Sequence, residues 1–237
     1  MAEKIGKYTV LLNNRPIILS SASIVGKSEG EGPLYKEWDE IVEDAMFGME
    51  NWEKAESELQ RRTIRKAIDK SGVKKENIDA VFAGDLLNQC VGSTFGAREL
   101  NIPFIGMYGA CSTMALTLAA ASVFVDSGAF KNAVAATSSH FCSAEKQFRY
   151  PLEYGGQRPP TAQRTATASG AMVIADGVGA VGVEAVTFGR IRDLGIKDAG
   201  NMGAAMAPVS VKLRPYPIQK SRRYASVFHH TKRQSER

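Results

Sequence analysis

The chain alternates between short runs of branched apolar residues and longer stretches in which apolar residues recur every three or four positions. The short runs have the length and composition of strands, and Gly, Pro, Asn or Asp residues bound them. The sequence therefore predicts strands at 16–25, 77–84, 104–107, 131–138, 170–175 and 180–188.

Helical spacing covers three stretches. The first, 38–70, has apolar residues such as Trp38, Ile41, Leu59 and Ile64 on one side and many charged residues on the other, a pattern more typical of a solvated helix face than of a binding patch. Shorter helices are predicted at 94–100 and 112–127.

The predicted order of elements is βαβαβαββ. Strands that alternate with helices indicate a mixed, mainly parallel sheet with helices on both faces, which is an α/β fold class. Asp176 and Gly177 separate the last two runs, so we expect these runs to form a hairpin that adds an antiparallel edge strand. The stretch 141–169 is predicted to be a long loop.

Composition adds one constraint. The 237 residues carry a net charge of +5, but residues 209–237 hold eight Lys or Arg and one acid, which leaves 22 basic and 24 acidic residues in the rest. The body of the chain is therefore not basic, and we expect no nucleic acid partner. The N-terminus lacks the features of a signal peptide, and no apolar run is long enough to span a bilayer.

Cys111 is the first candidate for chemistry. It stands where the apolar stretch 102–107 gives way to the predicted helix, and Gly109 allows a tight turn before it. The unpaired N–H groups and positive dipole of a helix start favour a thiolate, which makes Cys111 a candidate nucleophile. A buried structural cysteine is the alternative. None of the three cysteines has the spacing of a disulfide framework or a metal site, so no metal is expected.

Other polar residues follow the predicted strands. Asp85, Cys111 and the string Ser138-Ser139-His140 each come just past a strand, and ligands of such sheets bind beyond the carboxyl ends of the strands. The predicted loop adds arginines interleaved with aromatic residues. This combination can hold a planar carboxylate, although composition slightly favours ordinary surface arginines. The residues are Arg149, Arg158, Arg164, Phe148, Tyr150 and Tyr154.

Several unusual strings within 16–208 resemble the stage V sporulation protein AD family, whose members have a thiolase-like fold. They are DLLNQ at 85–89, GACST at 109–113, SSHF at 138–141, QFRYPLEYG at 147–155, QRPPTAQ at 157–163 and DAGNMGAAMAP at 198–208. The resemblance implies that the chain is one half of a thiolase-like fold.

The resemblance implies that the protein binds dipicolinic acid without catalysis and helps to move it into the developing spore. Asp85, Cys111, Ser138, Ser139, His140, Arg149 and Arg158 are then the expected ligand-binding residues. The implied partners are membrane proteins of the same sporulation operon, with a homodimer in the full-length family. The implied location is peripheral, on the cytoplasmic side of the spore's inner membrane. No cofactor is expected.

The chain departs from the family in two ways. Enzymes of the thiolase fold complete their site with His and Asn, or two His, from a second half of the fold, which we expect to be missing here. After Pro208 the sequence becomes basic and unlike the family, for which a frame error is the favoured explanation over a genuine tail. We therefore expect an N-terminal extension at 1–15, a thiolase-like domain at 16–208 and a disordered basic tail at 209–237.

Two other functions remain open. In the first, Cys111 is the nucleophile of an acyltransferase of the ketoacyl-synthase type, which takes an acyl group from coenzyme A or an acyl carrier protein; a thiolate without a matched base is a poor transferase. In the second, the basic tail binds nucleic acid or an anionic membrane, and such binding falls steeply with salt.

Overall fold

The structure is a computed structural model that describes residues 2–148, 164–190, 193–197, 203–204 and 206–208. The chain divides into two units, Met1–Gly189 and Arg190–Arg237. The helices and strands given below all lie in the first unit. Arg149 and Arg158, two of the expected ligand-binding residues, lie outside the described residues.

A six-stranded sheet forms the centre of this unit. Its order is β4-β3-β8-β7-β5-β6. The pairs β3/β4, β5/β7 and β5/β6 are parallel, and β8 is antiparallel to both β3 and β7. The sheet is therefore mixed and mainly parallel, as predicted. The strand bounds are β3 Ile17–Gly26, β4 Glu40–Val42, β5 Ala80–Gly84, β6 Phe104–Gly106, β7 Asn132–Ser139 and β8 Ala168–Ala175.

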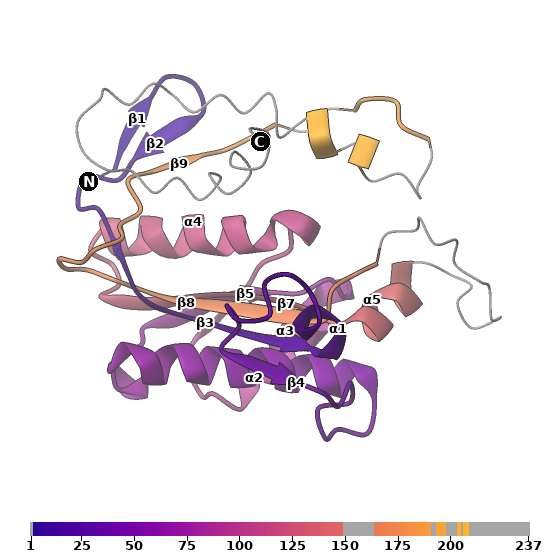
Figure 1. Cartoon of the computed structure of the whole chain (residues 1–237). Coiled ribbons are helices and arrows are strands. Elements are labelled where there is room, and N and C mark those ends of the chain that lie inside the picture. Colours follow the sequence, from indigo (N-terminus) through magenta and orange to yellow (C-terminus); the bar gives the residue numbers. More distant parts are fainter. Residues whose placement is uncertain (1, 149–163, 191–192, 198–202, 205, 209–237) are drawn as a thin grey trace, which may run out of the picture. The chain divides into compact units, whose positions relative to one another are not determined.

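Helices cover both faces of the sheet, which confirms the predicted α/β class (Figure 1). Helices α2 (Trp52–Ser71) and α3 (Val91–Arg98) lie on one face, and α4 (Thr113–Asp126) lies on the other. The alternation of side chains along a strand explains this arrangement. In β5, Val81 faces the cluster that contains Ile64 of α2, whereas Phe82 faces the cluster that contains Leu118 of α4.

Smaller elements complete the unit. The strands β1 (Glu3–Ile5), β2 (Thr9–Leu11) and β9 (Ala185–Thr187) form a separate antiparallel sheet in the order β1-β2-β9. Asn14 donates from its backbone N to Asp126 Oδ1 at 2.7 Å, which ties the following segment to the end of α4. The remaining helical elements are α1 Lys27–Gly30, α5 Phe141–Phe148 and the 3-10 turns Lys75–Asn77, Asn88–Cys90 and Ala110–Ser112. Among the described residues, no helix combines the length and the apolar character that a membrane span requires.

The predicted helix at 38–70 is wrong in its first part. Residues Glu40–Val42 form strand β4, which pairs with β3, and α2 begins only at Trp52. Glu40 forms ion pairs with Arg62 and Lys66 of α2, so this polar segment lies alongside α2 rather than extending it. Asn51 sets the helix start, because its side chain accepts a hydrogen bond from Lys54 N at 2.9 Å.

Two other predictions need correction. The hairpin at 170–188 does not form: β8 is a central strand between β3 and β7, and β9 pairs with β2 in the small sheet. A run of small and apolar residues buried on both sides suits such a central position. The stretch 141–169 is also not all loop, since α5 occupies Phe141–Phe148 and β8 begins at Ala168.

Substitution of Gly84, the last residue of β5, tests the packing of this strand against its neighbours. A Cβ added there would lie 1.8 Å from the backbone O of Met107 and 2.7 Å from Thr113 Cγ2. We expect Gly84→Ala to destabilise the fold by about 2 kcal/mol or more, because backbone atoms must move apart. Urea unfolding of the purified chain measures this change.

Gly170 of β8 provides the matched control, because no atom lies within 4 Å of a Cβ added at that position. Gly170→Ala is expected to change stability by no more than about 0.5 kcal/mol. Equal effects of the two substitutions would contradict the close approach of β5 to the 107–113 segment.

Candidate functional site

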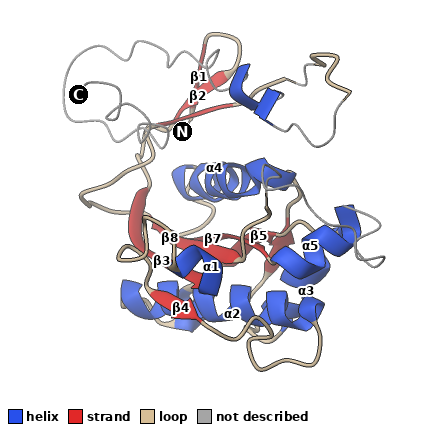
Figure 2. Ribbon diagram, turned by 45° about the vertical axis from the view of Figure 1, so that its right-hand side comes forward, coloured by secondary structure: helices blue, strands red, loops and turns tan. Residues whose placement is uncertain are grey.

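The candidate site lies at the carboxyl ends of β5 and β7, as the strand order predicts. Asp85 directly follows β5, and Ser138 and Ser139 close β7. Three helices also reach this end of the sheet: α2, α3 and α5 (Figure 2). The residues that meet here are mainly polar, although most of them are buried.

Asp85 is fully buried and holds the turn that leads into α3. Its Oδ1 accepts a hydrogen bond from Leu87 N at 2.8 Å. Its Oδ2 accepts from both the backbone N and the hydroxyl of Ser93, at 2.6 and 2.5 Å. Three donors therefore satisfy this carboxylate within the protein, and its structural role is to join β5 to α3.

Gln60 of α2 connects Asp85 to the neighbouring strand. Its Nε2 lies 3.0 Å from Gly84 O, 3.0 Å from Ser93 Oγ and 3.1 Å from Ser138 Oγ. The side chain is completely buried. One amide thus fixes α2 against the ends of both β5 and β7.

Glu56 lies one turn before Gln60 and is also completely buried. Its Oε1 accepts a hydrogen bond from Ser138 Oγ at 3.2 Å, and its Oε2 accepts from Ser143 Oγ of α5 at 2.6 Å. Burial raises the pKa of Glu56 to about 7, with a further upward contribution from the charge of Asp85, while the two serine hydrogen bonds oppose the shift. Glu56 therefore gains or loses its proton near neutral pH.

A pocket of about 300 Å³ opens beside this network. We call it the corner pocket, because α2, α3 and α5 meet around it. Lys146 is half-exposed and pairs with Glu53 at 3.4 Å, while Gln147 Oε1 accepts from Asn88 N at 3.1 Å. Among the described residues, the buried Nε2 of Gln147 has no hydrogen-bond partner. The lining residues are Glu53, Leu87, Asn88, Val91, Ser143, Lys146 and Gln147.

The corner pocket thus combines an ammonium group, which pairs with the carboxylate of Glu53, with an amide donor, a hydroxyl and the apolar side chains of Leu87 and Val91. Cationic and neutral donors together suit a small carboxylate, and the apolar side chains suit the ring or chain that carries it. Ser143 belongs both to this lining and to the hydrogen bonds of Glu56. The pocket is therefore linked to a buried titratable group.

His140 and Ser139 lie near the network but face other partners. The Nε2 of His140 is 2.7 Å from Ala45 O, and the residue is 1% exposed. Burial lowers the pKa of His140, and the contact with Ala45 O offsets this in part, so the imidazole is neutral at pH 7. Ser139 Oγ donates to Ala166 O at 2.6 Å.

Cys111 lies apart from these hydrogen bonds. It is exposed, in the 3-10 turn Ala110–Ser112 that precedes α4, close to where the sequence predicted a helix start. Thr113 fastens this turn by donating to Ala110 O at 2.8 Å. Within the described residues, the hydrogen-bonded network around Glu56 and Asp85 does not include Cys111.

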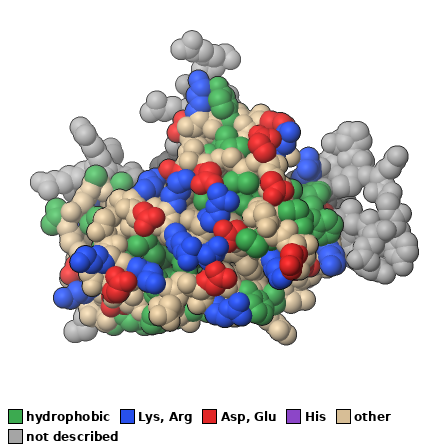
Figure 3. Space-filling model, turned by 90° about the horizontal axis from the view of Figure 1, so that it is seen from below, with side chains coloured by type: hydrophobic (Ala, Val, Ile, Leu, Met, Phe, Trp, Pro, Cys, Tyr) green, Lys and Arg blue, Asp and Glu red, His purple; other side chains and the backbone are tan. Residues whose placement is uncertain are grey.

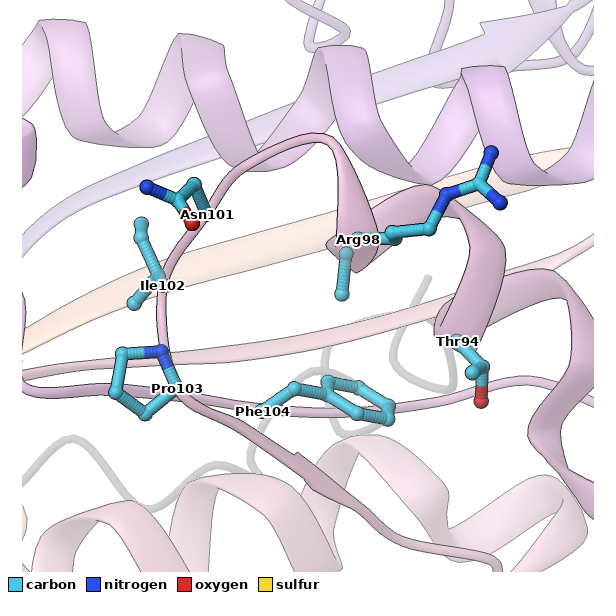
Figure 4. Close-up of a pocket in the computed structure, with 7 residues that line it drawn as sticks. Thr94, Arg98, Asn101, Ile102, Pro103 and Phe104 are labelled. Atoms are coloured by element: carbon cyan, nitrogen blue, oxygen red, sulfur yellow. The ribbon is translucent and has the colours of Figure 1, made fainter.

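A second cavity, of about 500 Å³, lies between α3 and β6. Figure 4 shows Ile102, Pro103 and Phe104 along one side of it, while the side chain of Arg98 extends away. Because its polar groups do not converge, this cavity offers less for a charged ligand than the corner pocket.

Sequence reasoning missed Glu56, Gln60, Ser93 and Ser143. The sequence predicts a solvated face for the charged residues of α2, which is correct for the side that Figure 3 shows, where Lys and Arg are interspersed with Asp and Glu. Glu56 and Gln60 differ because they border the buried stripe that contains Leu59 and Ile64. Their spacing of four residues, next to that stripe, is the sequence signal that could have identified them as buried partners.

Comparisons with known proteins come from sequence and from structure. The family model described as Stage V sporulation protein AD (SpoVAD) matches residues 6–226, a wider range than the 16–208 that carries the quoted strings. A curated relative, Stage V sporulation protein AD of Bacillus subtilis (strain 168), is 44% identical over 205 residues. These residues are 86% of this chain and 61% of the relative, so the chain spans about three fifths of that protein's length.

Solved structures with a related fold are more distant in sequence. The 3-oxoacyl-[acyl-carrier-protein] synthase III of Aquifex aeolicus is 15% identical, with a TM-score of 0.45 over 68% of this chain and 54% of that chain. A variant of OleA from Xanthomonas campestris is 14% identical, with a TM-score of 0.48 over 70% of this chain and 57% of that chain.

The raised pKa of Glu56 predicts how stability changes with pH. The folded state holds this proton up to about pH 7, whereas an unfolded glutamate releases it near 4.5. The contribution of Glu56 to the free energy of unfolding is therefore fully present below pH 4.5 and is lost as the pH rises to about 7. The total loss is about 3 kcal/mol. Glu56→Gln, which resembles the protonated form, should remove this pH dependence.

Urea unfolding at several pH values between 5 and 8 measures the effect. Glu58→Gln is the control, because Glu58 is on the same helix but pairs with Arg61 away from the network. A Glu56→Gln variant with the same pH dependence as the parent chain would show that Glu56 is ionised throughout this range.

Proposed function

The chain belongs to the stage V sporulation protein AD family, and on this premise we propose that it binds dipicolinic acid without chemically changing it. The observation that carries the proposal is the match of the family to most of the chain, at 44% identity to a curated relative. We also propose that this binding helps to move dipicolinic acid into the developing spore, beside membrane proteins of the same sporulation operon.

The corner pocket is the place that we propose for the ligand. Dipicolinic acid is a planar aromatic ring with two carboxylates, and both are ionised at neutral pH. Lys146 supplies a cation for one carboxylate. The Nε2 of Gln147, which has no partner among the described residues, supplies a neutral donor. Leu87 and Val91 supply apolar contact for the ring. Such a mixture of few directed polar groups and apolar walls is typical of small-molecule sites.

The acyltransferase alternative has less support from the described residues. A thiol nucleophile needs a base nearby to take its proton, or a strongly activating environment. His140 is the one histidine within the described residues, and it is buried against Ala45 O. Cys111 is exposed but has no histidine beside it in this part of the chain.

Removal of the positive charge in the corner pocket is expected to weaken dipicolinate binding. Lys146 is half-exposed, so its contribution is reduced by solvent, and Lys146→Gln should lower the affinity about fivefold. Isothermal titration calorimetry with dipicolinate measures the change. Lys70→Gln is the matched control, because Lys70, on α2, is similarly exposed and pairs with Asp39, which precedes β4.

The two variants separate the possible outcomes. Unchanged affinity in Lys146→Gln would place the ligand elsewhere on the protein. No binding by the unaltered chain at millimolar dipicolinate would contradict the proposed function itself.

The same preparation tests the acyltransferase alternative. After incubation with acyl-coenzyme A, mass spectrometry is expected to find no acyl adduct on Cys111, because the described residues place no histidine beside the thiol to take its proton. Cys111→Ser serves as the reference for nonspecific acylation. An adduct present in the unaltered chain and missing in Cys111→Ser would support the acyltransferase.

A further inference from the structure

We propose that Glu56 is a positioning residue for a carboxylate ligand in the corner pocket: when Glu56 takes up a proton, the hydroxyl of Ser143 becomes free to donate to that ligand. Binding of the anion and uptake of one proton by Glu56 are therefore coupled. The inference rests on the proposed function, since dipicolinate is the carboxylate considered.

The position of Ser143 is the basis of the proposal. Its side chain lines the corner pocket, although the residue is only 2% exposed. Its Oγ lies 2.6 Å from Glu56 Oε2 and 3.1 Å from His140 O. Both of these oxygens are acceptors when Glu56 is ionised, so the single hydroxyl proton of Ser143 is directed into the protein and away from the pocket.

Protonation of Glu56 reverses the direction of the short hydrogen bond. The carboxylic O–H of Glu56 then donates to Ser143 Oγ, and the Ser143 hydroxyl proton is released from Glu56. It can then turn from the carbonyl His140 O toward a ligand carboxylate, which is the stronger, charged acceptor. One proton moves from solvent to Glu56, and no covalent bond other than this O–H bond forms. The ligand carboxylate gains a donor that is absent at high pH.

The charges around Glu56 favour this exchange. Asp85, beyond the end of β5, and Glu53, on the preceding turn of α2, both oppose ionisation of Glu56. Lys146 of α5 is the nearby cation, but it pairs with Glu53. An incoming carboxylate adds one more negative charge to this side and makes proton uptake more favourable. The remaining titratable groups of α5 and the residue before it are Cys142, Glu145 and His140.

Ser138 extends the same coupling to the strand ends. It donates to Glu56 Oε1 at 3.2 Å and accepts from Gln60 at 3.1 Å. A proton on Glu56 thus changes the hydrogen bonds of α5 and β7 at once, whereas Asp85 keeps its own three donors. The pocket is adjusted without a movement of the sheet.

Calorimetry in buffers that differ in their heat of ionisation counts the protons taken up when dipicolinate binds. The pKa of about 7 leaves Glu56 half-protonated in the free protein. At pH 7 the unaltered chain should therefore take up close to half a proton per ligand, and its affinity should fall about fivefold from pH 6 to pH 8.

Two substitutions test the roles of the two residues. In Glu56→Gln the amide donates permanently to Ser143, so binding should persist with no proton uptake and no change in affinity over this pH range. In Ser143→Ala the donor is lost, so affinity at pH 6 should fall about tenfold, and the dependence of affinity on pH should weaken. Glu58→Gln, which lies outside the pocket, should behave as the unaltered chain does.

The outcomes distinguish this inference from the proposed function. If Glu56→Gln binds dipicolinate with undiminished proton uptake, another group supplies the proton, and the inference is wrong although the function stands. If Ser143→Ala retains full affinity, the hydroxyl does not contact the ligand. If the unaltered chain shows no heat and no stabilisation against thermal unfolding with millimolar dipicolinate, the inference fails together with the proposed function.

Discussion

Burial of two carboxylates, Glu56 and Asp85, is the constraint on which the organisation of the site depends. A buried acid is tolerated only where donors surround it or where it holds a proton. Asp85 follows the first route, with three donors from the loop and from α3. Glu56 follows the second in part, with two serine hydroxyls and a raised pKa. To meet these needs, α2, α3, α5 and the ends of β5 and β7 must all meet at one point.

Much of the main sheet could be predicted from the sequence, because the periods of two and of three to four residues are local signals. Strands β3, β5, β6 and β7 follow from their branched apolar runs. The errors arose where long-range contacts decide the structure. Glu40 forms an ion pair with α2 instead of being part of that helix, and β8 enters the sheet between β3 and β7. Neither choice is encoded by the residues of the segment alone.

The grouping of Asp85 and Ser138 was predictable, but the chemistry around them was not. The rule that ligands bind beyond strand ends correctly brought Asp85 and Ser138 together. It gave no indication that their polar atoms would be occupied within the protein, or that Glu56 and Gln60 would supply the partners. Those two residues lie on a helix rich in charge, and only the packing of α2 against the sheet separates them from the exposed charges beside them.

The buried carboxyl of Glu56 has a consequence for spectroscopy. A protonated carboxylic acid and an ionised carboxylate absorb infrared light at well-separated frequencies, and exposed acids are ionised at neutral pH. Glu56, with a pKa of about 7, is therefore an intrinsic vibrational reporter whose protonated band should stand clear of the exposed carboxylates. Under the proposed coupling, the occupancy of the neighbouring pocket is followed through a group that belongs to the protein itself, without any attached label.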